Sequence, residues 1–245
     1  MEAFITGIGW VTGAGFGWGS QGGECTFSDL PLPLLTRKDV FPEPNQRFGR
    51  MSDYAKLGLA ALAFALRDAG LEAWSEKRPI GVVAASQLGC LATDLDYHQS
   101  VLLQGGGLAS PNLFAYTLAN CFLGDAAIQF GLTGSSVAIN ETREGLDALA
   151  LAMEAIAMGD AQTMLAGICD LPAPQPFAGG LTLLPGALFL VLSSDPAAAK
   201  KNYGTLTLTD DGLLLHDGLA AGSLVDLARS ALAGRETTPA AGADS

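Results

Sequence analysis

The chain has 245 residues, of which 49% are hydrophobic and 16% are charged, a balance typical of globular rather than disordered proteins. Its 13 basic and 25 acidic residues give a formal net charge of −12, which argues against nucleic-acid binding because that binding rests on neutralising phosphates. No segment approaches the roughly 18 consecutive apolar residues of a membrane span. The first residues lack the basic start of a secretory signal, so we expect a cytoplasmic protein.

The first part of the chain predicts two strands, a loop and a helix. Residues 3–11 form an apolar, β-rich run interrupted by glycines, and four prolines within residues 29–45 predict a loop. Ser52 is predicted to cap a helix that ends before Gly70. Residues 80–85 are a short continuous apolar run, which is typical of a strand buried in a parallel sheet.

The rest of the chain alternates predicted helices and strands. After a loop at residues 104–111, helices are predicted over residues 116–130 and 146–158. Short strands are expected at residues 135–139, 163–168, 187–192 and 205–208. This alternation predicts an α/β domain whose mostly parallel sheet is covered by helices on both faces. The last residues, 236–245, are expected to form a disordered tail.

The helix predicted over residues 146–158 is apolar on nearly every side. Its only charged residues are Asp147 and Glu154. A helix that is apolar all round is normally buried all round. We therefore expect it to lie between two layers, and a chain of this size need not cover both of its faces alone.

The cysteines and glycines give no indication of a metal or a cofactor. The four cysteines are widely spaced and contain no C-x-x-C pair: Cys25, Cys90, Cys121 and Cys169. We expect them to be small buried thiols. Residues 7–13 resemble a dinucleotide-binding fingerprint, but Thr12 stands where the third glycine belongs and no acidic residue follows a second strand about 20 residues on. We read this segment as a tight strand exit and expect no cofactor.

The positive charges are unevenly distributed. Eight of the thirteen basic residues lie between Arg37 and Arg78, and Arg143 is the only one between Pro79 and Ala199. The basic stretch is either a solvated face or a patch for an acidic partner.

Four segments, in order, resemble β-ketoacyl-acyl carrier protein synthases, which have the thiolase fold. The segments cover about residues 1–195 and are Ile5–Thr12, Arg50–Ser52 with the helix to Gly70, Ser110–Asn120 with Phe130–Gly134, and Gly145–Leu149 with Met158–Gly167. The resemblance implies a thiolase-like α/β fold, mostly its N-terminal half, with a mixed sheet sandwiched by helices and a buried nucleophile-type helix. It also implies a β-ketoacyl synthase N-terminal-like domain at residues 1–200, followed by a residual C-terminal strand and helix at residues 201–235.

By this resemblance, the turn before the buried helix is where a working synthase carries its cysteine. The helix N-terminus stabilises a thiolate there, and backbone N–H groups bind an oxyanion. In this chain the turn, residues 140–145, reads Asn-Glu-Thr-Arg-Glu-Gly. Alignment on Gly145 puts Thr142 at the cysteine position, whereas alignment on Gly134 puts Arg143 there. Neither residue is a thiol.

The other catalytic groups of the family are also missing. Two histidines and a lysine lie in a C-terminal half that this chain mostly lacks, and neither His98 nor His216 stands in a matching motif. Nothing local supplies a base for Thr142. Glu141 and Glu144 are better explained as carboxylates at a helix N-terminus. We therefore expect no catalysis by this chain alone, and we leave open an acyltransferase, thioesterase or decarboxylase that acts at the altered turn.

Chain-length factors are the branch of the family that these losses resemble. They lack the cysteine and pair with an active ketosynthase, whose acyl tunnel they shape. Glu141 and residues 145–149 resemble their altered turn. The resemblance makes Leu113, Phe114 and Tyr116 candidates to line or cap a partner's tunnel, against ordinary core or interface packing.

The partners implied are a full-length ketosynthase in a heterodimer or a second copy in a homodimer, with an acyl carrier protein as a further candidate. The resemblance thus predicts a non-catalytic subunit in fatty-acid, polyene or polyketide synthesis. An acyl-binding homodimer is the remaining alternative.

Overall fold

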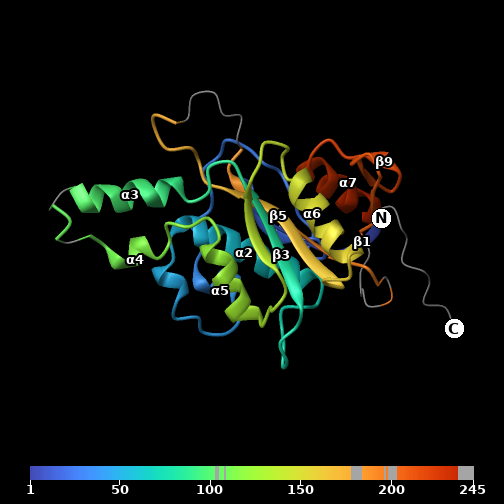
Figure 1. The fold of residues 1–245 in the computed structure, drawn as a ribbon, viewed down its shortest axis with the longest axis horizontal. Helices are drawn as coiled ribbons and strands as arrows, with labels where there is room; N and C mark the ends of the chain where they lie inside the picture. The colour runs from blue at the N-terminus through green and yellow to red at the C-terminus, as the bar shows by residue number, and fades with distance from the viewer. Residues whose placement is uncertain (103–104, 108, 178–183, 196, 198–202, 237–245) are drawn as a thin grey trace.

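A mixed sheet forms the centre of the fold (Figure 1). The computed structural model describes the whole chain except residues 103–104, 108, 178–183, 196, 198–202 and 237–245. The described residues form a nine-stranded sheet in the order β4-β3-β5-β6-β1-β7-β8-β9, and β2 pairs with β1 outside that path. Nearly all of the segment expected to be a disordered tail lies outside the described residues.

The strands are β1 (Glu2–Thr12), β2 (Gly15–Trp18), β3 (Ile80–Ser86), β4 (Ser136–Asn140), β5 (Thr163–Asp170), β6 (Gly186–Ser193), β7 (Thr205–Leu208), β8 (Leu214–His216) and β9 (Leu219–Ala220). The helices are α1 (Arg37–Val40), α2 (Asp53–Asp68), α3 (Leu91–Leu102), α4 (Pro111–Phe114), α5 (Cys121–Phe130), α6 (Leu146–Ala157) and α7 (Leu224–Glu236), with a 3-10 turn η1 (Phe48–Arg50). No helix among the described residues is long and apolar enough to cross a membrane.

The sheet is mixed rather than mostly parallel. β3 pairs in parallel with β4 and with β5. Every other pairing among the described strands is antiparallel, including those of β6 with β5 and with β1. The prediction from alternating elements is therefore wrong. β6 follows β5 without a crossover helix in the described residues between them, so it runs back beside β5. The mixed, thiolase-like sheet that the resemblance implied is confirmed.

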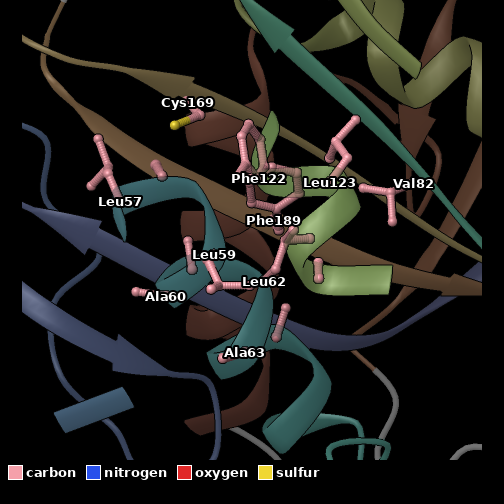
Figure 2. Close-up of a cluster of buried hydrophobic side chains, with 14 of the residues drawn as sticks. Leu57, Leu59, Ala60, Leu62, Ala63, Val82, Phe122, Leu123, Cys169 and Phe189 are labelled. Carbon is pink, nitrogen blue, oxygen red and sulfur yellow. The ribbon is translucent and has the colours of Figure 1, made fainter. Parts of the chain in front are cut away.

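One apolar core lies between the sheet and helices α2 and α5. Figure 2 shows Leu59 and Leu62 of α2 close to Phe122 of α5 and Phe189 of β6. The ring centroids of Phe122 and Phe189 are 6.2 Å apart. α2 begins as predicted, because the Ser52 hydroxyl accepts a hydrogen bond from the N–H of Ala55 at 3.3 Å.

Glycines in β1 let α2 approach the sheet closely. A Cβ atom on Gly9 would lie 2.1 Å from the backbone nitrogen of Ala65, so only glycine fits at this position. The glycine-rich segment is therefore part of the strand itself, and the prediction of a tight strand exit at residues 7–13 is wrong for most of its length. The chain turns only after Thr12 and runs back as β2.

A second core lies on the opposite face of the sheet, under α6 and α7. Leu149 and Ala152 of α6 and Leu227 of α7 are buried in it. On the outer side of α6, however, Leu151 is 40% exposed and Met158 is 75% exposed. The expected burial on all sides is thus not reached within this chain, since α7 lies beside α6 in the same layer and no described element covers the outer side of α6 (Figure 1).

Helices α3 and α4 extend away from the body of the molecule and are called here the α3–α4 arm (Figure 1). Thr93 is the only buried residue of α3, and α4 has none. The sequence did not predict α3, and the helix expected over residues 116–130 begins only at Cys121. The arm therefore has few apolar contacts with the rest of the chain.

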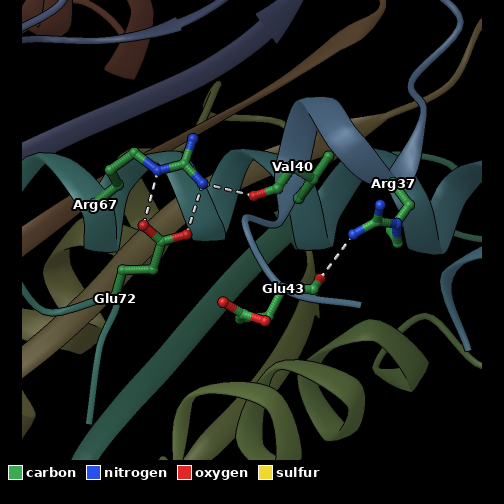
Figure 3. A network of polar contacts seen from close by, with 5 residues as sticks. All are labelled: Arg37, Val40, Glu43, Arg67 and Glu72. Atoms are coloured by element: carbon green, nitrogen blue, oxygen red, sulfur yellow. Dashed lines mark hydrogen bonds and ion pairs between the residues drawn. The ribbon is translucent and has the colours of Figure 1, made fainter. Parts of the chain in front are cut away.

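Arg67 ties the loop around α1 to the end of α2 (Figure 3). Its Nε and Nη2 atoms donate to the carboxylate of Glu72 at 2.8 and 2.6 Å, and Nη2 also donates to the carbonyl of Val40 at 2.6 Å. The guanidinium lies over the Trp18 ring, 4.9 Å from its centroid. In the same loop, Arg37 donates to the carbonyl of Glu43.

Candidate functional site: the turn before α6

The turn between β4 and α6 lies where the carboxyl ends of β3, β4 and β5 meet. Glu144 and Gly145 both have positive φ values, of 54° and 92°, and this left-handed pair turns the chain into the helix. A Cβ atom on Gly145 would lie 2.6 Å from Cβ of Leu224 in α7, so the turn requires glycine there. The N–H of Leu224 in turn donates to the carbonyl of Glu144 at 3.0 Å. α7 therefore packs directly on the turn.

Glu141 holds the N-terminus of α6. Its carboxylate accepts hydrogen bonds from the backbone N–H groups of Gly145 and, at 2.9 Å, of Asp147. These are groups that a helix leaves without internal partners, and the helix dipole favours an anion beside them. The residue is 7% exposed. Burial raises the pKa of the Glu141 carboxyl above its usual value, and the two backbone hydrogen bonds oppose that rise.

Thr142 and Arg143, the two candidates for the cysteine position, are both exposed. The Nη1 atom of Arg143 forms an ion pair with Oδ1 of Asp147 at 2.6 Å. No histidine lines the cavity beside the turn, as far as the structure describes the chain. His98 is exposed on α3, and His216 is buried on β8, where its Nε2 lies 2.9 Å from the carbonyl oxygen of Tyr203. Thr142 thus has no imidazole beside it to act as a base.

A cavity of about 210 Å³ opens beside the turn. Strand ends, the turn and α7 all contribute to its wall. Its polar lining consists of Ser86, Gln87, Glu141, Glu144, Asp170, Ser223, Asp226 and Arg229, and its apolar lining includes Phe27, Ile168 and Val225. The four carboxylates outnumber the single guanidinium, so the cavity does not favour an anionic ligand.

Sequence reasoning missed Asp170 and Ser86. Asp170 is 6% exposed at the end of β5, and its Oδ1 accepts a hydrogen bond from the Ser86 hydroxyl, at the end of β3, at 2.6 Å. Burial raises the pKa of the Asp170 carboxyl, against the effect of its hydrogen bonds. A signal was present, because both residues end apolar runs that the sequence identifies as strands. Polar residues at the carboxyl ends of neighbouring parallel strands lie close together.

Burial makes the four cysteines poor nucleophiles. Burial raises the pKa of Cys25 and of Cys121 to about 12, raises that of Cys90 to about 11, and raises that of Cys169 well above its ordinary value. A thiol with such a pKa is protonated at neutral pH and is a poor nucleophile. No group of three or more potential metal ligands occurs among the residues that the structure describes.

The three residues predicted to face a partner lie in and just after the α3–α4 arm, away from the turn. Phe114 is 62% exposed, and its ring centroid lies 5.4 Å from that of Tyr97 on α3. Leu113 is half-buried beside it. Tyr116 instead packs against the core under α2 and hydrogen-bonds to Asp125.

β4 is an exposed edge of the sheet. Val137 is 44% exposed, and Ser136 and Asn140 are exposed as well. The strand contains no proline and no charged residue, which are common means by which proteins prevent an edge strand from pairing with another chain. The other end of the sheet closes with β9, which is only two residues long. Of the two ends of the main strand order in the described residues, the β4 end therefore presents the longer strand for pairing.

Comparison with known proteins identifies relatives of this sequence. Residues 36–184 match the sequence model of the β-ketoacyl synthase N-terminal domain. The chain is 35% identical over 120 residues to 3-oxoacyl-[acyl-carrier-protein] synthase 2 of Vibrio cholerae, covering 48% of this chain and 29% of that protein. It is 27% identical over 193 residues to a putative polyketide β-ketoacyl synthase 1 of Streptomyces virginiae, covering 73% and 42%. The chain thus spans less than half the length of these curated relatives.

Solved structures share the fold. The ishigamide ketosynthase/chain length factor aligns with a TM-score of 0.66 at 18% identity, covering 84% of this chain and 62% of that one. A chain of the ketosynthase (ApeO) in complex with its chain length factor (ApeC) from Xenorhabdus doucetiae aligns with a TM-score of 0.54 at 20% identity. That alignment covers 80% of each chain, so the two chains are about equally long.

Proposed function

Because this chain belongs to the β-ketoacyl synthase N-terminal domain family, we propose that it is a non-catalytic, chain-length-factor-like partner of an active β-ketoacyl-acyl carrier protein synthase. In this role it helps to shape the partner's acyl tunnel in fatty-acid, polyene or polyketide synthesis. The observation that carries the proposal is the position of the Glu141 carboxylate on the N-terminus of α6.

A filled helix N-terminus argues against acyl transfer at this turn. Thioester chemistry would use these backbone N–H groups to stabilise a thiolate and then an oxyanion. Here the N–H groups of Gly145 and Asp147 already bind the chain's own carboxylate. An entering oxyanion would have to displace Glu141, which is buried. The turn therefore works better as a structural support than as a reaction site.

Three uncovered features support an association with another chain. The edge of β4 is open, the outer side of α6 exposes Leu151 and Met158, and the α3–α4 arm exposes Phe114. A partner with the same fold could extend the sheet at β4 while the arm reaches over its surface. We propose a full-length ketosynthase as this partner, with a homodimer as the alternative.

A solved structure from such a complex shares this fold. A chain of similar length, from a complex of a ketosynthase with its chain length factor, aligns with 80% of this one. At 20% identity the likeness is one of fold. It supports the proposal that a short chain of this fold can take part in such a complex.

An acyl carrier protein would dock mainly on the partner. Of the basic stretch, Arg67 and Arg78 donate to groups of their own chain, and Arg47 forms an ion pair with Asp125 at 3.5 Å. Lys38, Arg50 and Lys77 remain exposed. Against a net charge of −12, these few cations offer an acidic carrier protein only a minor contact.

Co-purification with a ketosynthase encoded beside this chain tests the proposal. The expected result is a one-to-one complex by native mass spectrometry. Replacing Phe114 with Ala or Trp should then change the length of the product, whereas Leu34→Ala, at a residue 90% exposed outside the arm, should not. A stable monomer that binds no ketosynthase would contradict the proposal.

The cavity beside the turn, which Glu141 and Glu144 line but Thr142 does not, leaves a second candidate, an acyltransferase, thioesterase or decarboxylase acting at the altered turn. Its volume of about 210 Å³ would admit only a short acyl group. Incubation with acyl thioesters, followed by mass spectrometry, would reveal an adduct on Thr142. Turnover that is abolished by Thr142→Ala would decide for this candidate. We expect neither an adduct nor turnover.

A further inference from the structure

We infer that Asp170 is a positioning residue that fixes the direction of the α3–α4 arm, and thereby the way in which the arm meets a partner. The second step rests on the proposed function. The first step is a property of this chain alone, so each can be tested separately. Asp170 itself is buried and belongs to β5, not to the arm.

The carboxylate of Asp170 accepts hydrogen bonds from the turn at which the α3–α4 arm begins. Its Oδ1 accepts hydrogen bonds from the Ser86 hydroxyl at 2.6 Å, from the N–H of Gln87 at 3.1 Å and from the N–H of Leu88 at 3.1 Å. The Ser86 hydroxyl oxygen accepts from the N–H of Gly89 at 2.5 Å. One side chain thus organises the four residues that follow Ala85, and α3 begins at Leu91.

Besides the turn itself, Cys90 anchors the entry of the arm, because its side chain is buried in the core directly before α3. Thr93 is the only buried residue of α3. The contact between Tyr97 and Phe114 joins α3 to α4, and Ser110 donates to the Ser100 hydroxyl at 3.3 Å, so both contacts are internal to the arm. A helix with so few apolar contacts to the body takes its direction from the segment at its base.

The arm also contacts the body where the chain returns from α4, but these contacts do not set the direction in which α3 begins. Asn112 of α4 donates to the carbonyl of Arg50 at 2.9 Å, and the Tyr54 hydroxyl donates to the carbonyl of Ala119 at 3.3 Å. Both fix the return of the chain to the body. The direction in which α3 leaves β3 is determined by the turn that Asp170 holds.

The same turn is joined to the altered nucleophile turn. The N–H of Glu141 donates to the carbonyl of Ser86 at 3.2 Å, and the side chain of Asn140 donates to the carbonyl of Gln87 at 2.7 Å. Asp170 therefore lies at a junction between the Glu141 turn and the base of the arm. A buried acidic residue that touches no partner can in this way influence how the arm docks.

Hydrogen exchange of the isolated chain tests the first step. Asp170→Ala removes the acceptor, and we expect the amides of residues 87–102 that the structure describes to exchange about tenfold faster or more, while those of α2 and β6 keep their protection. Asp170→Asn, which retains one acceptor oxygen, should restore most of the protection. Asp160→Ala, a loss of charge at an exposed site, should change nothing.

If Asp170→Ala does not fold, Ser86→Ala provides the same test, because it removes the 2.6 Å hydrogen bond and leaves the carboxylate in place. Faster exchange confined to residues 87–102 supports the inference. Unchanged exchange in that segment, or a uniform increase along the chain, overturns it, since a uniform increase reports only a general loss of stability.

Binding and product length test the second step. In a binding titration, Asp170→Ala should have an affinity for the ketosynthase about tenfold weaker than that of the unmodified chain. At concentrations that saturate the ketosynthase, it should still shift the length of the products, and Asp170→Asn should rescue both. A merely structural defect would lower the yield of folded subunit without changing product length at saturation. If the unmodified chain binds no ketosynthase, the proposed function fails, while the exchange measurement still decides whether Asp170 fixes the arm.

Discussion

Glu141 is the residue that occupies the N-terminus of α6 at the candidate site. Its carboxylate accepts hydrogen bonds from the N–H groups of Gly145 and Asp147 at the N-terminus of α6. The sequence indicated this role, because the carboxylate precedes a helix that could be recognised from its composition. The role of Asp170 could not be recognised in the same way, since its partner Ser86 lies 84 residues away, and only the pairing of β3 with β5 brings them together.

Removal of the Glu141 carboxylate should destabilise the protein. Glu141→Ala leaves two backbone N–H groups of α6 without their acceptor, and we expect the free energy of unfolding to fall by about 1–3 kcal/mol. Glu141→Gln keeps an acceptor oxygen and should cost less. Urea denaturation measures both, with Glu144→Gln at an exposed carboxylate as the control. Equal stability of Glu141→Ala and the unmodified protein would contradict this role.

The raised pKa of Glu141 predicts a pH dependence of stability. Burial raises its folded-state pKa above the ordinary value of 4.5, so the folded state binds its proton more tightly than the unfolded state does. The corresponding stability is fully present below that ordinary value and is lost as pH rises through the folded-state pKa. In urea denaturation between pH 4 and pH 8, Glu141→Gln should lack this loss. The same pH profile in both proteins would count against it.

The secondary-structure elements differ in how well the sequence predicts them. The helices and strands with strong apolar patterns, α2, β3, β5 and β6, were predicted within a few residues because burial of a regular face determines them. α3 was missed because its sequence has no buried face, and β8 was missed because it is only three residues long. The helix α7 was expected only from the family resemblance, as part of the strand and helix at residues 201–235. The loop with α1 has no such pattern either, and it depends on the hydrogen bonds of Arg67.

Arg67→Ala should loosen this loop. It removes two hydrogen bonds to Glu72, one to the carbonyl of Val40 and the contact with Trp18. We expect a loss of about 1–3 kcal/mol in the free energy of unfolding. Arg67→Lys should recover only part of it, because an ammonium group cannot reproduce the paired geometry. Thermal unfolding measures the change. Lys77→Ala, at an exposed cation, is the control, and an equal effect of both variants would refute the assignment.

A charge on β4 should block association without harming the fold. Val137 is 44% exposed on the edge strand, and a lysine there is a device by which edge strands avoid pairing. We expect Val137→Lys to weaken binding to the ketosynthase by about tenfold or more while the melting temperature stays unchanged. Leu34→Lys, placed at another exposed leucine, should bind normally. Normal binding by Val137→Lys would show that β4 is not in the interface.

At the scale of the whole molecule, three surfaces of the layered structure are uncovered in the part of the chain that the structure describes. α2 and α5 cover one face of the sheet and α6 and α7 the other, but the outer side of α6, the edge of β4 and the α3–α4 arm have no cover within the described residues (Figure 1). The composition of α6 predicted this incompleteness, because a helix apolar on nearly every side requires more than one covering layer. We propose that a second chain of the same family covers all three features.

We propose that this chain supports catalysis by a partner ketosynthase and performs none itself. The most direct test compares product formation by the chain alone, by the ketosynthase alone and by the two together, each with carrier protein and acyl substrates. We expect products of defined length only when this chain and the ketosynthase are both present. We expect no product when the nucleophilic cysteine of the ketosynthase is replaced by alanine. Turnover by this chain alone, or turnover that survives that replacement, would contradict it.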